Sequence, residues 1–140
     1  GLCRNLIETL KKRYQRVNLV LFGDHGMVNV TRTLDLEVRL ARTGLVHGVD
    51  YAYFLDSTMA RFWFHHAAAR AVVQDALGNI TGGRMLDASA MKHYGIDCCD
   101  YRNAEAVFLA DPGVLIFPNY FQASGEPIRG MHGYDPDCAD

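Results

Sequence analysis

Residues Val17 to Met27, which read VNLVLFGDHGM, hold the most informative pattern in this chain. The segment from Val17 to Phe22 is mostly apolar, contains β-branched valines and has the length of a buried strand, and Gly23 ends it. Upstream, apolar residues recur at helical spacing between residues 2 and 14, which predicts an amphipathic helix. Because a helix followed by a buried strand is typical of α/β proteins, the sequence predicts a parallel α/β sheet.

Asp24 and His25 come directly after this predicted strand, with a glycine on each side. In open α/β sheets, functional groups collect at the carboxyl ends of the strands. A carboxylate oxygen beside an imidazole nitrogen suits Zn²⁺, and also Mn²⁺ or Fe²⁺. Tetrahedral zinc needs about four donors, so further ligands would have to come from distant sequence. Taken alone, the dipeptide is better explained as a turn in which Asp24 caps the next segment and His25 lies on the surface.

The sequence of residues 45–118 predicts a small α+β unit. Alternating apolar residues on both sides of Asp56-Ser57-Thr58 indicate two strands joined by a turn, and Asp87 is the expected cap of a short helix. The predicted elements are a β-hairpin over 49–64, helices over 67–77 and 87–94, and a strand pair over 105–110 and 113–117, turned through Asp111-Pro112-Gly113. After Pro118, closely spaced glycines and prolines predict a loop.

A second His-containing motif, Gly130-Met131-His132-Gly133-Tyr134-Asp135, lies in this loop. His132 again stands between small or flexible residues, and Asp135 is near enough in sequence to orient it through a hydrogen bond. Arg129 is a candidate for phosphate contact. A lone histidine in such a loop is more often simply exposed, so the motif gains meaning only together with Asp24 and His25.

Taken together, the strand-GDHGM segment and the late GMHGYDP segment resemble the two C-terminal metal-ligand motifs of the alkaline phosphatase superfamily, in its type I phosphodiesterase/nucleotide pyrophosphatase branch. The order of the two motifs, the α+β insert between them and the stretch from Tyr51 to Trp63 all fit that branch. The resemblance covers nearly the whole chain. It implies the C-terminal portion of an alkaline-phosphatase-like parallel sheet, with residues 1–44 and 119–140 in the metal-binding catalytic domain and residues 45–118 as a small α+β insert subdomain.

The resemblance also implies a function and assigns roles to residues. In that family two divalent metal ions, usually zinc, flank the phosphate oxygen and the nucleophile. Asp24 and His25 match ligands of the metal that activates the nucleophile, and His132 matches a ligand of the second metal. The implied reaction is metal-dependent hydrolysis of a phosphate ester, and the implied substrate is a small-molecule phosphate ester or a nucleotide.

Several family motifs have no counterpart here, because only sixteen residues precede Val17. Family members carry an earlier strand-end Asp, a Thr or Ser nucleophile and a D-x-x-x-H motif, so no catalytic nucleophile is nominated in this chain. We expect a fragment that needs the remainder of a parent chain, that is inactive alone and that binds metal weakly or not at all. The alternatives are a non-catalytic interaction or regulatory domain, and a phosphonate hydrolase, sulfatase or phosphomutase relative.

The composition also limits which kinds of partner this chain can have. The formal charge of -2, from 14 basic and 16 acidic residues, provides no field that would attract a nucleic acid polymer. No apolar run reaches the ~20 residues that would span a membrane, and the Gly1-Leu2-Cys3 start has no signal-peptide features. The four cysteines, which include the adjacent pair Cys98-Cys99, are expected to be reduced structural thiols. Among compartments, the cytoplasm is favoured.

Overall fold

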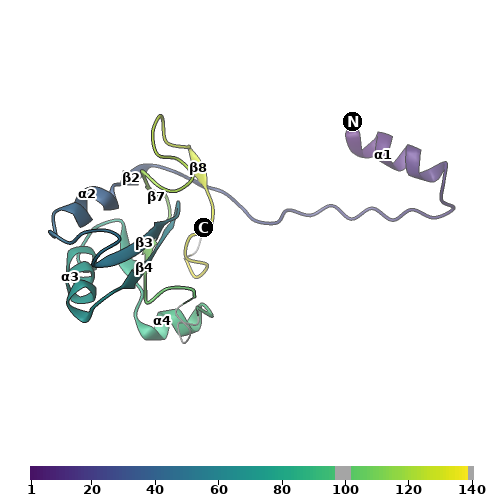
Figure 1. The fold of residues 1–140 in the computed structure, drawn as a ribbon. Coiled ribbons are helices and arrows are strands. Elements are labelled where there is room, and N and C mark those ends of the chain that lie inside the picture. The colour runs from purple at the N-terminus through teal and green to yellow at the C-terminus, as the bar shows by residue number, and fades with distance from the viewer. Residues whose placement is uncertain (97–101, 139–140) are drawn as a thin grey trace.

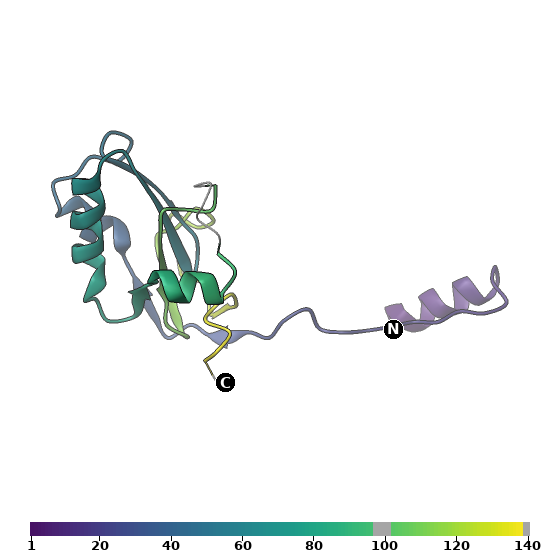
Figure 2. The same cartoon turned by 90° about the horizontal axis from the view of Figure 1, so that it is seen from below.

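The structure is a computed structural model that describes residues 1–96 and 102–138. An N-terminal arm, residues 1–24, extends away from a body formed by the rest of the chain (Figures 1 and 2). The elements are, in order, α1 (Leu2–Lys11), β1 (Val28–Asn29), β2 (Arg32–Leu34), α2 (Leu36–Ala41), β3 (Tyr51–Leu55), β4 (Met59–Phe64), α3 (Ala67–Gly78), β5 (Gly83–Met85), α4 (Ala88–His93), β6 (Ala106–Ala110), β7 (Val114–Ile116) and β8 (Gly130–Met131).

The prediction of a buried strand at residues 17–22 is wrong for this structure. This segment is extended but has no strand assignment, and Val20, Leu21 and Phe22 are 80%, 70% and 85% exposed. A buried strand needs neighbouring strands to satisfy its N–H and C=O groups, and none of the described strands pairs with these residues. The predicted N-terminal helix is confirmed as α1, but none of its residues is buried.

A four-stranded antiparallel sheet in the order β3-β4-β6-β5 forms the centre of the body. The predicted hairpin is confirmed, with Tyr51 opposite Phe64 and Leu55 opposite Ala60. Along β6 the side chains alternate between two core clusters, because successive residues of a strand point to opposite faces. Phe108 packs with the Val73 side of α3, whereas the neighbouring residues Val107 and Leu109 pack with Leu86 and Met91. Helices α3 and α4 therefore cover opposite faces of the sheet (Figure 2).

The segments predicted as a strand pair at 105–117 both form strands, but they do not pair with each other. Strand β6 has β4 on one edge and β5 on the other, so neither edge remains for β7. Instead β7 pairs in parallel with β2, with Arg32 opposite Val114 and Leu34 opposite Ile116. The predicted turn is confirmed, since the Val114 N–H donates to the Asp111 carbonyl. The predicted pairing of the two strands across this turn is wrong.

The last described segment is mostly loop, as predicted, apart from the short strand β8. Strand β8 pairs antiparallel with β1, with Val28 opposite Met131 and Asn29 opposite Gly130. The Val30 N–H extends this contact by bonding the Arg129 carbonyl at 2.9 Å. The pairing lies just after Asp24-His25 and just before His132, so it brings the two predicted ligand loops to one place in the fold.

Candidate metal-binding site

The two predicted histidine ligands are in direct contact. The imidazole rings of His25 and His132 stack with their centroids 3.7 Å apart and their planes inclined by 19°. The β1–β8 pairing explains this contact, because Val28 and Met131 are opposite each other and the chain continues from each towards a histidine. The structure thus brings together two residues from opposite ends of the sequence.

Asp24 and His25 form a second close pair. Asp24 Oδ2 lies 3.5 Å from His25 Nε2, and Asp24 Oδ1 accepts a hydrogen bond from the His25 backbone N–H at 3.0 Å. His25 Nδ1 lies 2.9 Å from the Gly26 carbonyl oxygen. Because a carbonyl can only accept, Nδ1 carries the proton in this contact, and the lone pair of the neutral ring is then on Nε2 beside the carboxylate. The side chains are 81% and 43% exposed, so a solvent ion can reach them.

An open cleft of about 610 Å³ adjoins these residues. Both histidines line it, and the other wall comes from the segment that follows His132, including Tyr134, Asp135 and Cys138. Cys138 and Cys3 are free and exposed, so they do not match the structural role expected of the cysteines, and Cys98-Cys99 lies outside the described residues. The cleft is large enough for a small ligand next to the two imidazoles.

The Asp135 carboxylate is buried and its bonds differ from those expected. Oδ2 forms a 2.7 Å ion pair with the Arg84 guanidinium, and Oδ1 accepts from the Tyr94 hydroxyl at 2.7 Å and from the Asp137 N–H at 3.0 Å. The Arg84 hydrogen bond is the largest cause that lowers the pKa of Asp135 to about 2. The sequence makes Asp135 a candidate to orient His132, but among the described residues its carboxylate bonds Arg84, Tyr94 and the Asp137 N–H and not His132.

Arg84 and Tyr94 are the residues of this region that sequence reasoning missed. Arg84 is in the edge strand β5 and Tyr94 follows α4, so neither is close in sequence to Asp135. No spacing rule links an isolated arginine and a helix-terminal tyrosine to a distant loop. Arg129, the predicted phosphate contact, has an exposed side chain and uses its carbonyl in the contact with Val30.

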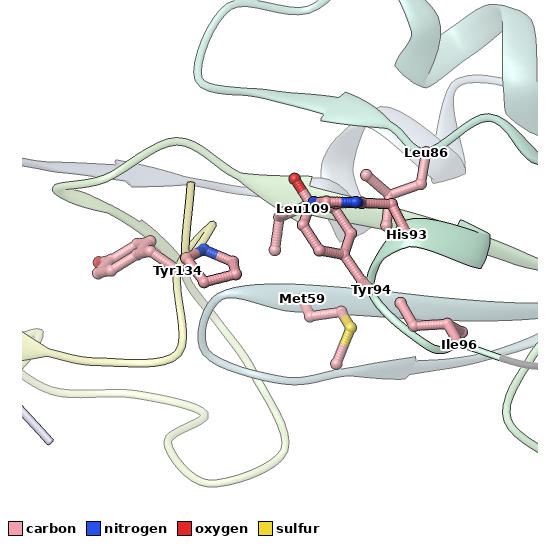
Figure 3. A pocket seen from close by; sticks show the side chains of 8 residues that line it. Met59, Leu86, His93, Tyr94, Ile96, Leu109 and Tyr134 are labelled. Carbon is pink, nitrogen blue, oxygen red and sulfur yellow. The ribbon is translucent and has the colours of Figure 1, made fainter. Parts of the chain in front are cut away.

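A second cavity, of about 420 Å³, adjoins the cleft. Its walls are mainly apolar, and it shares Tyr134 and Pro136 with the cleft. Figure 3 shows His93, Tyr94 and Tyr134 around it, together with Met59, Leu86, Ile96 and Leu109. The segment after His132 therefore lies between the cleft that the two histidines line and an apolar cavity beside the end of α4.

The described residues lack two kinds of feature. Among residues 1–96 and 102–138, no cluster of three or more His, Cys, Asp or Glu side chains is grouped closely enough to hold a metal ion. Within the same residues, every helix is too short or too polar to cross a membrane.

One comparison with known proteins shows the family, and another shows a similar fold. The chain matches the type I phosphodiesterase / nucleotide pyrophosphatase family over residues 2–135, while a comparison with curated proteins gave no match. Among solved structures it is similar to murine ectonucleotide pyrophosphatase / phosphodiesterase 5, with a TM-score of 0.56 and 24% sequence identity. That similarity covers 81% of this chain and 28% of the other, and it shows a shared fold. The chain thus has part of an alkaline-phosphatase-like fold and belongs to the type I phosphodiesterase/nucleotide pyrophosphatase family.

Proposed function

We propose that this chain supplies part of the two-metal centre of a phosphate ester hydrolase. In this proposal Asp24 and His25 bind one divalent cation and His132 binds a second one. The observation that carries it is the stacking of His25 on His132 at 3.7 Å, beside a cleft that both residues line. Membership in a phosphodiesterase/nucleotide pyrophosphatase family supports the same reaction class.

The donor atoms of Asp24 and His25 fit a shared cation. Two ligands of a tetrahedral zinc ion, each at about 2.1 Å from the metal, are ~3.4 Å apart. Asp24 Oδ2 and His25 Nε2 are 3.5 Å apart, and the contact of Nδ1 with the Gly26 carbonyl leaves the Nε2 lone pair available. A backbone carbonyl that fixes the tautomer of a ligand histidine is a common arrangement at metal sites.

The stacked rings fit two cations better than one. The lone pair of an imidazole nitrogen lies in the plane of its ring, so nearly parallel rings direct their lone pairs along neighbouring planes and do not converge on a single point. In two-metal hydrolases the cations are about 3.5–4 Å apart. The 3.7 Å separation of the His25 and His132 rings is similar to that spacing.

The proposed chemistry also requires residues from outside this chain. Bound cations, zinc being the favoured identity, would lower the pKa of an attacking hydroxyl and neutralise charge on the phosphoryl group. The nucleophile and the remaining ligands would come from the remainder of a parent chain, with residues 45–118 as an insert subdomain. The substrate would be a small-molecule phosphate ester or a nucleotide. We accordingly expect the isolated chain to be inactive and to bind metal weakly.

The test is an assay of the parent protein on aryl phosphodiesters, phosphomonoesters and nucleotides, with and without a chelator. We expect chelation to abolish turnover, and Asp24→Asn or His132→Ala to lower kcat/KM by more than about 100-fold. Asp75→Asn on the exposed side of α3 and His47→Ala, which lies away from the cleft, are matched controls and should retain activity. Turnover that survives complete removal of metal would refute the proposal, and a parent protein with no turnover would favour a non-catalytic domain.

A further inference from the structure

The segment that begins at His132 is attached to the body by a buried hydroxyl. Thr58, in the turn between β3 and β4, is 5% exposed, and its Oγ1 donates to the Gly133 carbonyl at 2.8 Å. Gly133 has a φ of +83°, and a Cβ at this position would lie 3.3 Å from Thr58 Oγ1. A glycine is needed here because most other residues avoid this backbone conformation and would also crowd the hydroxyl.

A second attachment acts at Asp135. Its carboxylate is nearly buried, with a side chain 7% exposed, and it binds Arg84 from β5 and Tyr94 from the end of α4. Both bonds measure 2.7 Å, a short distance typical of charge-assisted hydrogen bonds. The attachment connects β5 and the end of α4 to the turn after His132, and Tyr94 also lines the apolar cavity (Figure 3).

His132 is therefore fixed from both directions along the chain. On its N-terminal side, Met131 is held by the pairing of β8 with β1. On its C-terminal side, Gly133 and Asp135 are held by residues between 45 and 118. A metal ligand performs well only when the groups behind it hold its orientation within narrow limits.

We propose that Thr58, Arg84 and Tyr94 are positioning residues that hold His132 against His25 and thereby set the geometry of the metal centre. The inference rests on the proposed function and gives the 45–118 region a specific role in it. None of the three touches a metal or substrate in this proposal, because each acts through the backbone or the carboxylate next to His132. The consequence is that changes in the insert should alter metal affinity.

An exposed hydrogen-bonded contact of the same turn supplies a control. Asp137 Oδ2 lies 2.7 Å from His93 Nε2, but the two side chains are 60% and 62% exposed. Exposed pairs of this kind contribute little to the structure around them. Asp137→Asn therefore changes an exposed contact of this turn without removing a buried one.

The experiment uses Thr58→Val and Tyr94→Phe in the parent protein, singly and together, because each removes a hydroxyl with little change in shape. Zn²⁺ affinity of metal-stripped protein is measured by competition with a chromogenic chelator. The imidazole resonances of His25 and His132, assigned from their loss in His25→Gln and His132→Gln, are recorded by NMR without metal. Thermal unfolding checks that each variant is folded, and Tyr94→Phe alone replaces the double variant if that variant does not fold.

We expect the double variant to bind Zn²⁺ about 10- to 100-fold more weakly than wild type, with kcat reduced and KM little changed. The two imidazole resonances should shift or broaden together, and Asp137→Asn should leave affinity and resonances unchanged. Folded variants with wild-type affinity and unmoved resonances would overturn the inference. A wild-type protein that neither binds Zn²⁺ nor hydrolyses any ester would instead refute the proposed function, while the metal-free spectra would still test the positioning.

Discussion

Three hydrogen-bond donors lower the pKa of the Asp135 carboxyl. The Arg84 side chain, the Asp137 N–H and the Tyr94 hydroxyl, in that order, lower the pKa of Asp135 from 3.8 to about 2. A carboxyl whose pKa is lower in the folded state contributes stability above its unfolded pKa and loses it as the pH falls towards the folded one. We therefore predict that Asp135→Asn lowers the free energy of unfolding by about 1–2 kcal/mol at pH 7, a range reduced by the partial exposure of Arg84.

Urea unfolding of wild type and Asp135→Asn at a series of pH values measures this difference. It should be largest at neutral pH and should shrink from about pH 4 to about pH 2, where the wild-type carboxyl becomes protonated. Asp137→Asn, at an exposed pair, should differ little from wild type throughout. A loss of stability in Asp135→Asn that is as large at pH 2 as at pH 7 would contradict an electrostatic origin.

Single residues also show what sequence could and could not predict about the site. Asp24, His25 and His132 could be nominated because they occur in short motifs with recognisable neighbours, and two of them do meet in space. Arg84 and Tyr94 could not be nominated, because their significance comes only from their contact with Asp135. Short motifs identify donor groups, whereas the groups that hold the donors are brought in by the fold.

Helix α3 depends on an unusual N-terminal cap. His66 Nδ1 accepts from the Ala69 N–H at 3.1 Å, while Nε2 lies 3.0 Å from Asp50 Oδ1. The first N–H groups of a helix have no partner within the helix, so this bond satisfies one of them. We predict that His66→Ala lowers the free energy of unfolding by about 0.5–2 kcal/mol, measured by chemical denaturation. His66→Asn, which keeps an acceptor at this position, should recover most of that loss.

If His66→Asn were less stable than His66→Ala, the N-cap hydrogen bond would not be the contribution that the His66 ring makes to stability. The contact with Asp50 would then be the more important one, and Asp50→Asn should reproduce the effect of His66→Ala. Helix α4 offers an independent comparison, because its cap Asp87 accepts from Ala90 N–H at 2.8 Å and was predicted from the sequence. The cap at His66 was not predicted, since histidine is not among the preferred N-cap residues.

Most elements within 45–118 could be predicted because hydrophobic period and turn residues are local signals. The hairpin β3–β4 and helices α3 and α4 all form at the predicted places. The pairing of β7 was mispredicted because it is decided by competition, in which β4 and β5 occupy both edges of β6 and leave β7 to β2. The sequence around one strand does not show which edges of the neighbouring strands are already paired.

At the scale of the whole molecule, the arm that includes residues 17–22 has an apolar sequence but is exposed to solvent. The apolar pattern that predicts a buried strand is present, but Leu21 and Phe22 are 70% and 85% exposed, and the chain covers only 28% of its structural neighbour. A sequence pattern predicts the burial a segment needs, whereas the burial it obtains depends on which other strands are present. This explains why the strand prediction failed while the family assignment held.

The exposed arm leads to a prediction for the isolated chain. Contiguous exposed apolar residues on an extended segment favour association with another copy through backbone pairing and burial. We predict concentration-dependent association in size-exclusion chromatography with light scattering. Phe22→Ser should weaken it by about tenfold or more, because burying one phenylalanine side chain contributes about 1.5–3 kcal/mol. Tyr120→Ser is the matched control, since Tyr120 is also an exposed aromatic residue, at 73%, but lies on the body rather than the arm. If the wild-type chain stays monomeric at high concentration, or if both substitutions weaken association equally, then the arm is not the surface through which copies meet.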